Sequence, residues 1–198
     1  MNSLKFYFLL SNIKKKKINI VECGVGSGDS LSCIHKVSEL MNFETQIWAF
    51  DSFEGFPNFS SEDEGKYKRG YNKPNYKLYD VKHVKKTMKS YDVDDEQIAK
   101  CKFIKGFFPE SFKNYNGDFI DFLHIDVDLY QSYKYCLEYF WPYLKEGSIV
   151  VFDEYKNKDD LYKWPGASKA IDEFFLKKNL DVQKIRQENF KGKYYYQL

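Results

Sequence analysis

A glycine-rich turn between a strand pattern and a helix pattern constrains the fold most strongly. Residues 18–21 are mostly β-branched and predict a strand, and the turn ECGVGSGDS follows it at residues 22–30. Asp29 or Ser30 is expected to cap the helix that comes next. The buried face of that helix is predicted to hold Leu31, Ile34, Val37 and either Leu40 or Met41. Glycine allows a sharp bend and a close approach of a ligand to the backbone, so the segment indicates a ligand-binding frame.

Acidic side chains follow two later strand patterns. Residues 119–125 and 148–152 are apolar runs typical of buried strands, and each ends in a pair of acids. The pairs are Asp126 with Asp128 and Asp153 with Glu154. A single aspartate could merely cap the following helix, but two pairs fit that explanation poorly. Ligands collect outside the carboxyl ends of strands in an open α/β sheet, so these four acids predict a functional site.

The order of the remaining patterns gives the fold class. Strands are predicted at residues 46–50, 102–105, 181–187 and 193–197, and helices at residues 80–90, 94–100, 133–140 and 164–175. Gly147 is expected to stop the helix before residue 148. Alternating strands and helices that end in a hairpin predict an α/β, Rossmann-like sheet of seven strands, mostly parallel, with an antiparallel C-terminal hairpin. At 198 residues, the range 1–198 is expected to be a single domain.

Composition narrows the partners and the compartment. The formal net charge is +2, so no overall basic field favours nucleic acid as a partner. The four cysteines show neither a CxxC pair nor metal-ligand spacing, which favours a reduced, cytoplasmic chain. No apolar run reaches the roughly 18 residues of a membrane span, and residues 6–10 are too short for the core of a signal peptide, so stable membrane insertion is not expected.

The residues around the two ligand-facing turns discriminate between cofactors. A dinucleotide-binding GxGxxG pattern would need glycine at position 29, where Asp29 would face a pyrophosphate. An NAD-dependent oxidoreductase is therefore the weaker alternative. The pattern ExGxGxG, which includes Glu22, resembles the first motif of class I S-adenosylmethionine (SAM) methyltransferases, whose ligand is cationic. Asp51 ends the strand at residues 46–50, where it is placed to accept the hydroxyls of an adenosine ribose.

The long irregular stretch at residues 58–79 interrupts the alternation. It mixes basic residues with tyrosines, a combination that could hold an anionic sugar or a nucleotide diphosphate. A lid or binding loop and an ordinary solvated loop both remain open as interpretations.

Six motifs occur in an order that resembles the macrocin (TylF-type) O-methyltransferase family, over about residues 18–198. They are ECGVGSGDS, DSFEGFP, KGFFPES, LHIDVDLYQS, VVFDEY and WPGASKAIDEFF. Members of this family are class I enzymes that depend on SAM and on a divalent metal, and they methylate sugar hydroxyls, notably on macrolide and aminocoumarin antibiotics. The resemblance implies the same fold and the same activity for this chain.

The resemblance also implies roles for particular residues. The cofactor-binding set would be Glu22, Gly24, Gly26, Gly28, Ser30, Asp51, Ser52 and Gly106. Asp126, Asp153 and Glu154 would hold Mg²⁺ or Mn²⁺, and Asp128 would act as general base, with its role not separated from that of Asp126. Oxygen ligands suit these hard ions, which lower the pKa of a bound hydroxyl. Glu154 stands where the family commonly has aspartate, so its longer side chain would have to fold back to reach the ion.

Other expectations concern the acceptor and the neighbours. Only about 17 residues precede the first predicted strand, fewer than in the antibiotic-tailoring members of the family, so we expect an open acceptor pocket suited to a glycan, glycolipid, nucleotide sugar or glycosylated natural product. A homodimer is one oligomeric state that the sequence leaves open. His124 lies inside the strand at residues 119–125 and is expected to be a packed, hydrogen-bonded residue. A catalytically inactive nucleotide- or glycan-binding module is the second alternative.

Overall fold

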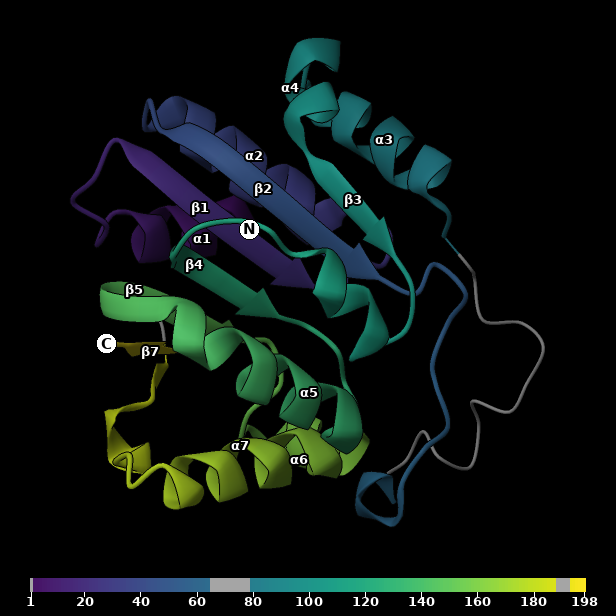
Figure 1. The fold of residues 1–198 in the computed structure, drawn as a ribbon, viewed down its shortest axis with the longest axis vertical. Coiled ribbons are helices and arrows are strands. Elements are labelled where there is room, and N and C mark those ends of the chain that lie inside the picture. Colours follow the sequence, from purple (N-terminus) through teal and green to yellow (C-terminus); the bar gives the residue numbers. More distant parts are fainter. Residues whose placement is uncertain (1, 65–78, 188–192) are drawn as a thin grey trace.

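The protein is a three-layer α/β sandwich, with helices on both sides of one twisted sheet (Figure 1). The structure is a computed structural model that describes residues 2–64, 79–187 and 193–198. Within these ranges the strands run in the order β3-β2-β1-β4-β5-β7-β6. Their bounds are β1 Lys17–Cys23, β2 Glu44–Asp51, β3 Lys102–Lys105, β4 Ile120–Ile125, β5 Leu144–Phe152, β6 Arg186–Gln187 and β7 Tyr194–Gln197.

Strands β1 to β5 run parallel to one another, and β7 runs antiparallel to both β5 and β6. The predicted fold, a mostly parallel seven-stranded sheet with an antiparallel C-terminal pair, is therefore confirmed. Because β1 and β4 are adjacent at the centre, the turns after them meet at one edge of the sheet. This edge is where an open α/β sheet binds ligands.

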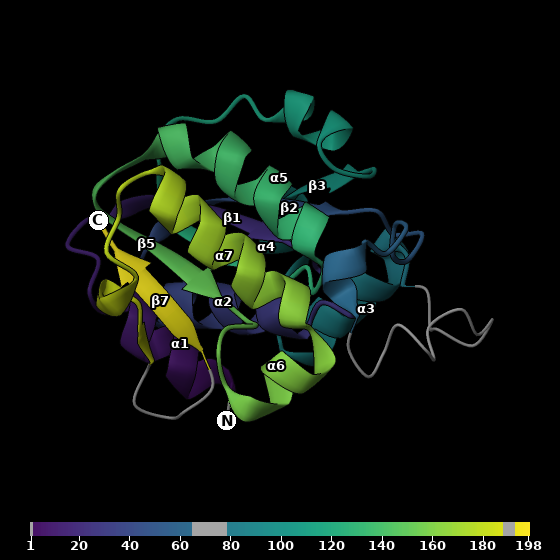
Figure 2. The same cartoon turned by 90° about the horizontal axis from the view of Figure 1, so that it is seen from below.

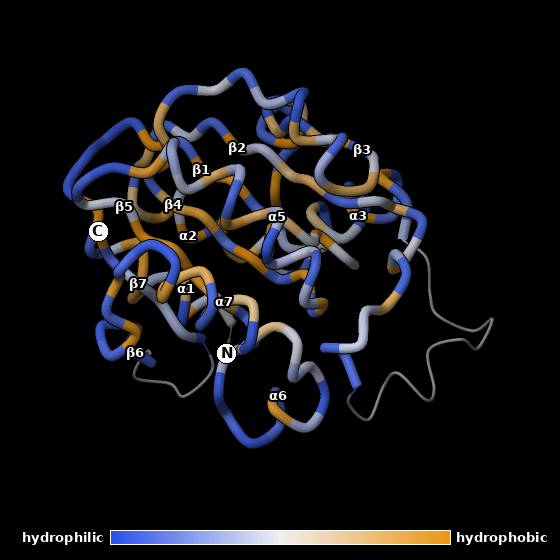
Figure 3. Tube along the Cα trace, turned by 60° about the horizontal axis from the view of Figure 1, so that its bottom comes forward, coloured by the Kyte–Doolittle hydropathy of each residue, from blue (hydrophilic) through white to orange (hydrophobic). Residues whose placement is uncertain are grey.

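The helices divide between the two faces of the sheet, and Figure 2 shows α5 and α7 lying together over one of them. Helices α1 to α4 contribute to the apolar cluster on the opposite face. The helix bounds are α1 Asn2–Leu10, α2 Asp29–Leu40, α3 Val81–Ser90, α4 Asp95–Lys100, α5 Tyr130–Phe140, α6 Lys158–Lys163 and α7 Pro165–Lys177. Figure 3 shows the hydrophobic strands inside and mostly hydrophilic loops around them.

Successive side chains of each central strand point to opposite faces, as the strand period of two requires. On the face covered by α1 and α2 lie Ile20, Phe122 and Val151. On the face covered by α5 and α7 lie Val21, Leu123 and Phe152. All six are essentially inaccessible to solvent. This alternation also decides which acids meet beyond the strand ends.

An aromatic cluster fixes the turn that follows β3. Phe112 is fully buried and packs on Phe50 and Phe140, with ring centroids 5.5 and 4.7 Å away. Phe108 stacks on Phe112 at 4.5 Å. Such ring pairs contribute about 0.5–1.5 kcal/mol each beyond the burial of their area. The cluster therefore holds the turn at residues 106–108 against the rest of the sheet edge.

The structure corrects several local predictions. Gly147 does not stop a helix; it lies inside β5 at a φ of 85°, and α5 already ends at Phe140, before a 3₁₀ turn that contains Pro142. Neither Asp29 nor Ser30 caps α2, because Gly28 occupies the N-cap position with no side-chain cap. Of the strand predicted at residues 181–187, only Arg186–Gln187 form β6, and Val182–Lys184 form a 3₁₀ turn.

Two helices were not predicted, α1 and α6. The spacing of Phe6, Leu9, Leu10 and Ile13 is helical, and all four are buried, so the signal for α1 was present. The irregular stretch at residues 58–79, interpreted as either a lid or binding loop or an ordinary solvated loop, lies mainly outside the described residues. Its described beginning contains the 3₁₀ turn Ser61–Asp63, whose Asp63 accepts a 2.7 Å hydrogen bond from the Tyr130 backbone N–H at the start of α5. No helix in the described residues is both long and apolar enough to cross a bilayer.

Candidate functional site

The glycine turn after β1 is locked to the end of β4. Gly24 has a φ of 84°, and a Cβ at this position would lie 1.7 Å from the carbonyl oxygen of Asp126. The backbone N–H of Asp126 donates to the carbonyl of Cys23 at 2.9 Å, which draws the two turns together. Only glycine fits this contact, because any Cβ would collide with the main chain. Gly24 therefore brings the first acid of the β4 turn next to the glycine turn.

The other two glycines of the turn differ in role. Gly26 has a φ of 51°, and a Cβ added to it would meet no heavy atom within 4 Å, so this residue borders open space. A Cβ on Gly28 would instead meet Val84 of α3 at 2.8 Å. Gly28 therefore lets α3 pack against the turn, and the structure does not bring it to the ligand side.

Asp51 ties the glycine turn to the turn after β2. Its Oδ2 accepts the backbone N–H groups of Val25 and Gly26 at 2.8 and 3.0 Å. Its Oδ1 accepts the Phe53 N–H at 2.7 Å and lies 3.4 Å from the Ser52 hydroxyl. A carboxylate offers about four lone-pair sites, and two backbone donors already engage Oδ2. The Ser52 hydroxyl donates its hydrogen to the carbonyl of Gly55 at 2.6 Å, so Oδ1 has a single close donor and the most capacity for a ligand hydroxyl.

A cavity of about 710 Å³ opens over these turns. Its volume lies within the range of roughly 300–1,000 Å³ that is usual for small-molecule sites. Nine of the predicted site residues line it: Gly24, Gly26, Ser30, Asp51, Ser52, Gly106, Asp126, Asp128 and Asp153. The residues that sequence reasoning placed in the site and that do not line it are Glu22, Gly28 and Glu154.

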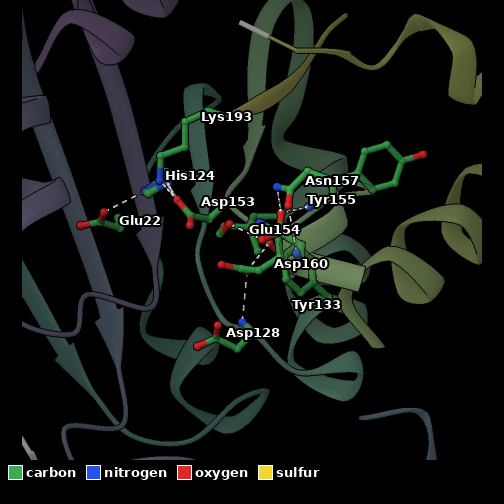
Figure 4. A network of polar contacts seen from close by, with 11 residues as sticks. Glu22, His124, Asp128, Tyr133, Asp153, Glu154, Tyr155, Asn157, Asp160 and Lys193 are labelled. Carbon is green, nitrogen blue, oxygen red and sulfur yellow. Dashed lines mark hydrogen bonds and ion pairs between the residues drawn. The ribbon is translucent and has the colours of Figure 1, made fainter. Parts of the chain in front are cut away.

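Glu22 lies beneath the cavity, paired with His124 on the neighbouring strand (Figure 4). Both side chains are fully buried, and Oε1 of Glu22 is 2.8 Å from Nδ1 of His124. His124 is thus packed and hydrogen-bonded, as expected. Its other ring nitrogen, Nε2, lies 3.7 Å from Oδ1 of Asp153.

Asp153 also forms an ion pair with Lys193, a residue that sequence reasoning did not single out. Phe152 of β5 pairs with Tyr194 of β7 in the antiparallel register, so Lys193 lies directly across from Asp153. Burial lowers the pKa of the Lys193 ammonium, while Asp126 and Glu22 oppose that change. The hairpin register would have indicated this pair only if the sequence had given the first residue of the last strand without error.

Glu154 points to the opposite face of the sheet from Asp153. Its Oε2 accepts a 2.8 Å hydrogen bond from the Tyr133 hydroxyl of α5 and lies 3.3 Å from the backbone N–H of Asp128 (Figure 4). Burial raises the pKa of Glu154 well above its ordinary value, and Asp128 and Asp126 raise it further. The structure therefore differs from the predicted metal set, because consecutive residues at a strand end face opposite ways.

Asp128 stands at the turn into α5 with a φ of 59°, a left-handed conformation that aspartate tolerates better than most residues. Burial raises its pKa well above the ordinary value, and the neighbouring charges of Asp126 and Asp160 add to this. A carboxylate with a raised pKa is a stronger proton acceptor than an ordinary aspartate. Asp128 is thus suited to accept a proton from a group bound in the cavity.

Three potential metal ligands converge under the cavity. One ligand atom from each of His124, Asp126 and Asp153 can be chosen so that all lie within 4.8 Å of one another. Glu154 does not belong to this group. Sequence reasoning gave no site role to several other residues that line the cavity. Lys5 comes from the unpredicted helix α1, Tyr135 lies within the predicted helix at residues 133–140, and Phe107, Phe108 and Gln131 lie inside the quoted motifs.

Comparisons with known proteins agree with the architecture. A family model described as "Macrocin-O-methyltransferase (TylF)" matches residues 6–196. Demethyldecarbamoylnovobiocin O-methyltransferase of Streptomyces niveus is 26% identical over 162 residues, which cover 80% of this chain and 58% of the relative. Mycinamicin III 3''-O-methyltransferase of Micromonospora griseorubida is 23% identical over 148 residues, covering 69% and 55%. The chain thus spans somewhat over half the length of these curated relatives.

Solved structures share the fold across almost the whole chain. The O-methyltransferase NovP superposes with a TM-score of 0.73 at 23% identity, covering 99% of this chain and 77% of the other. The calicheamicin methyltransferase CalS11 gives a TM-score of 0.76 at 22% identity, covering 99% and 78%.

Proposed function

Because the chain belongs to the macrocin O-methyltransferase (TylF) family, we propose that it transfers the methyl group of SAM to a hydroxyl of a sugar-containing acceptor. The observation that carries the proposal is that a single cavity joins the turns of Gly26 and Asp51 to the acids Asp126, Asp128 and Asp153. A cofactor and an acceptor hydroxyl could therefore meet in one cavity.

The cofactor half of the cavity would be formed by the glycine turn and the turns after β2 and β3. We propose that Oδ1 of Asp51 accepts a ribose hydroxyl, and that Gly26 leaves room for the cofactor against its backbone. The remaining contacts would come from Gly24, Ser30, Ser52 and Gly106, which all line the cavity. Glu22 and Gly28 would support this half from below and from behind, since neither lines the cavity.

The cavity also disfavours the dinucleotide alternative. Asp29 begins α2 and lines the cavity, at the helix end where a dinucleotide fold would bind pyrophosphate. A carboxylate there would repel the diphosphate of NAD, whereas SAM contains no phosphate group. The position of Asp29 thus favours SAM over NAD for a chemical reason that the sequence already indicated.

The acid half of the cavity would activate the acceptor. The side chains fit a divalent ion, because two carboxylates and the Nε2 atom of His124 converge there. This ring nitrogen is buried and has no hydrogen-bond partner among the described residues. When bound, such an ion lowers the pKa of a hydroxyl and fixes its position. Asp126 and Asp153 would hold the ion, and Asp128 would accept the proton of the hydroxyl. General-base catalysis of this kind contributes about 100- to 10,000-fold.

The acceptor class rests on the named relatives, which act on demethyldecarbamoylnovobiocin and mycinamicin III. We propose a glycan, glycolipid, nucleotide sugar or glycosylated natural product. The described approach to the cavity carries Phe56, Asn58 and Tyr79, which could contact a sugar. A single catalytic domain, a reducing cytoplasmic setting and a homodimer stay predictions; the free cysteines Cys23, Cys33, Cys101 and Cys136, all buried, support the reducing setting.

The test measures transfer of a labelled methyl group from SAM to a panel of sugars, nucleotide sugars and glycosylated natural products, with and without EDTA. We expect transfer that chelation abolishes and that Asp126→Ala reduces by at least about 100-fold. Full activity of that variant, or activity that EDTA does not change, would show that methyl transfer does not require the metal. Clear binding of S-adenosylhomocysteine (SAH) without transfer to any acceptor would favour the inactive binding module.

A further inference from the structure

The proposed methyl transfer assigns no role to the hydrogen bond between the buried side chains of Glu22 and His124, which lie beneath the cavity. Glu22 of β1 and His124 of β4 are register partners in adjacent parallel strands, and both are 0% exposed. The ring of Phe6 packs edge-on against His124 at 5.3 Å and closes the pair off from solvent. A buried imidazole held in this way has a fixed ring orientation.

The hydrogen bond to Glu22 also sets which ring nitrogen carries the proton. A carboxylate only accepts hydrogen bonds, so Nδ1 of His124 must carry the hydrogen in the 2.8 Å contact with Oε1. In the neutral imidazole, Nε2 then presents its lone pair toward Asp153, a residue that lines the cavity. Within the described residues Nε2 has no hydrogen-bond partner, and it faces Oδ1 of Asp153 at 3.7 Å.

Two groups that offer lone pairs therefore face each other under the cavity. Ligand atoms of Asp126, Asp153 and His124 all lie within 4.8 Å of one another, a separation that one ion can bridge. A histidine that binds a metal through one nitrogen commonly donates the other N–H to a carboxylate. The arrangement of Glu22 behind His124 is of this kind.

We infer that His124, through Nε2, is the third protein ligand of the metal beside Asp126 and Asp153, and that Glu22 positions it. This inference rests on the proposed metal-dependent function. Glu154 was expected to be the third metal ligand, but it faces Tyr133 on the other side of the sheet. His124 of the neighbouring strand β4 takes this role instead.

Lys193 supplies the positive charge of the site when no metal is bound. Its ammonium pairs with Asp153 and lies 5.7 Å from the centre of the Phe6 ring, on the same side of the sheet as His124. A divalent ion that binds Oδ1 of Asp153 competes with this ammonium. Lys193→Met is therefore expected to tighten metal binding, provided that the variant remains folded.

A ligand set of one imidazole and two carboxylates also changes the expected metal preference. Oxygen-only sites suit Mg²⁺, whereas imidazole favours transition metals. We therefore expect tighter binding of Mn²⁺ than of Mg²⁺. This differs from the preference expected of an all-carboxylate site.

The test is pulsed EPR of the full chain loaded with Mn²⁺ in the presence of SAH, which detects a nitrogen bonded directly to manganese. We expect a ¹⁴N coupling in the parent protein and its loss in His124→Gln. Glu22→Gln should weaken Mn²⁺ binding by about 10- to 100-fold, the usual effect of removing such a supporting carboxylate. Glu154→Gln is the matched control and should retain both the coupling and the affinity.

Several outcomes separate this inference from the proposed function. Binding of SAH, measured by calorimetry on the same samples, shows that each variant is folded and tests the cofactor site independently. Bound Mn²⁺ without ¹⁴N coupling, loss of Mn²⁺ binding in Glu154→Gln, or SAH binding with no Mn²⁺ binding would each overturn the assignment of His124. A ¹⁴N-coupled Mn²⁺ in a protein that does not bind SAH would uphold His124 and contradict the SAM proposal.

Discussion

Asp153 and Glu154 are neighbours in the chain, yet their carboxylates lie in different environments. Asp153 lines the cavity and pairs with Lys193, whereas Glu154 is buried against Tyr133. The sequence shows two adjacent acids at a strand end, but it does not show which of the two side chains points toward the cavity. That depends on which face of β5 each helix covers, a property of the packed molecule.

The burial of Glu154 has a consequence for stability. Burial raises the pKa of its carboxyl, so between the ordinary value of 4.5 and the raised folded value the folded protein holds a proton that the unfolded chain releases. Stability from this residue is greatest below pH 4.5 and declines as the pH rises through that window. Glu154→Gln imitates the protonated form and should raise the free energy of unfolding at pH 7 by on the order of 1 kcal/mol.

This prediction is checked by denaturant unfolding between pH 5 and pH 8 in metal-free buffer. The Glu154→Gln variant should show a flatter pH dependence than the parent. Glu146→Gln, which changes an exposed glutamate of β5, is the matched control and should follow the parent curve. A Glu154→Gln protein that is less stable than the parent at pH 7 would show that the carboxylate is charged and satisfied in the fold.

Asp128 offers a test of the proposed general base. Asparagine tolerates its left-handed backbone, so Asp128→Asn should preserve the turn while removing the proton acceptor. We expect kcat for methyl transfer to fall by about 100- to 10,000-fold, with SAH binding unchanged. Asp159→Asn, on the exposed side of α6, should leave the rate unaltered. Activity of Asp128→Asn within tenfold of the parent would assign the base elsewhere.

At the scale of elements, two glycines of the same turn are expected to have different roles: Gly24 allows the contact with the β4 turn, and Gly26 leaves room for the cofactor. Gly24→Ala would place a Cβ against the Asp126 carbonyl and should cost about 3 kcal/mol or more, from the left-handed backbone together with the collision. Gly26→Ala meets nothing within 4 Å and should cost only about 1–2 kcal/mol, but it should weaken SAH binding. Thermal unfolding and calorimetry distinguish the two effects. A Gly24→Ala protein as stable as the parent would contradict the contact.

The strand-turn-helix elements of the centre could be predicted because each has its own local signal. The apolar runs before residues 22, 51, 126 and 153 correspond to β1, β2, β4 and β5. Helix α1 was missed although its apolar spacing was present, and Gly147 was misread because glycine also accommodates a positive φ inside a strand. The contacts of Glu22 and Lys193 depend on strand order and register, which no local pattern specifies.

At the scale of the whole molecule, the cavity is formed by chain segments that are far apart in the sequence. The residues that line it include Lys5 of α1, Asp51 at the end of β2, Asp128 before α5 and Lys193 before β7. Sequence reasoning identified the strand-end members, because strand ends are recognisable. It missed the members contributed by α1 and by the last hairpin, because only the packing of the sheet brings them to the same edge.

Ligand binding by the whole fold discriminates between SAM and dinucleotide. SAH at 100 times its dissociation constant should raise the free energy of unfolding by about 2.7 kcal/mol, which corresponds to roughly 5–10 °C in Tm for a chain of this size. NAD should give no shift at the same concentration. Gly26→Ala should lose most of the SAH effect. Stabilisation by NAD and not by SAH would reverse the cofactor assignment.

The most direct test of the account is anomalous diffraction from crystals grown with SAH and Mn²⁺. We predict an anomalous peak at coordination distance, about 2.0–2.3 Å, from Asp126, Asp153 and Nε2 of His124, with the SAH ribose at Asp51 in the same cavity. A manganese peak on Glu154 instead of His124 would contradict the ligand assignment. SAH bound outside this cavity, or no manganese beside Asp126, would contradict the central claim that one cavity joins the cofactor to a metal-activated acceptor.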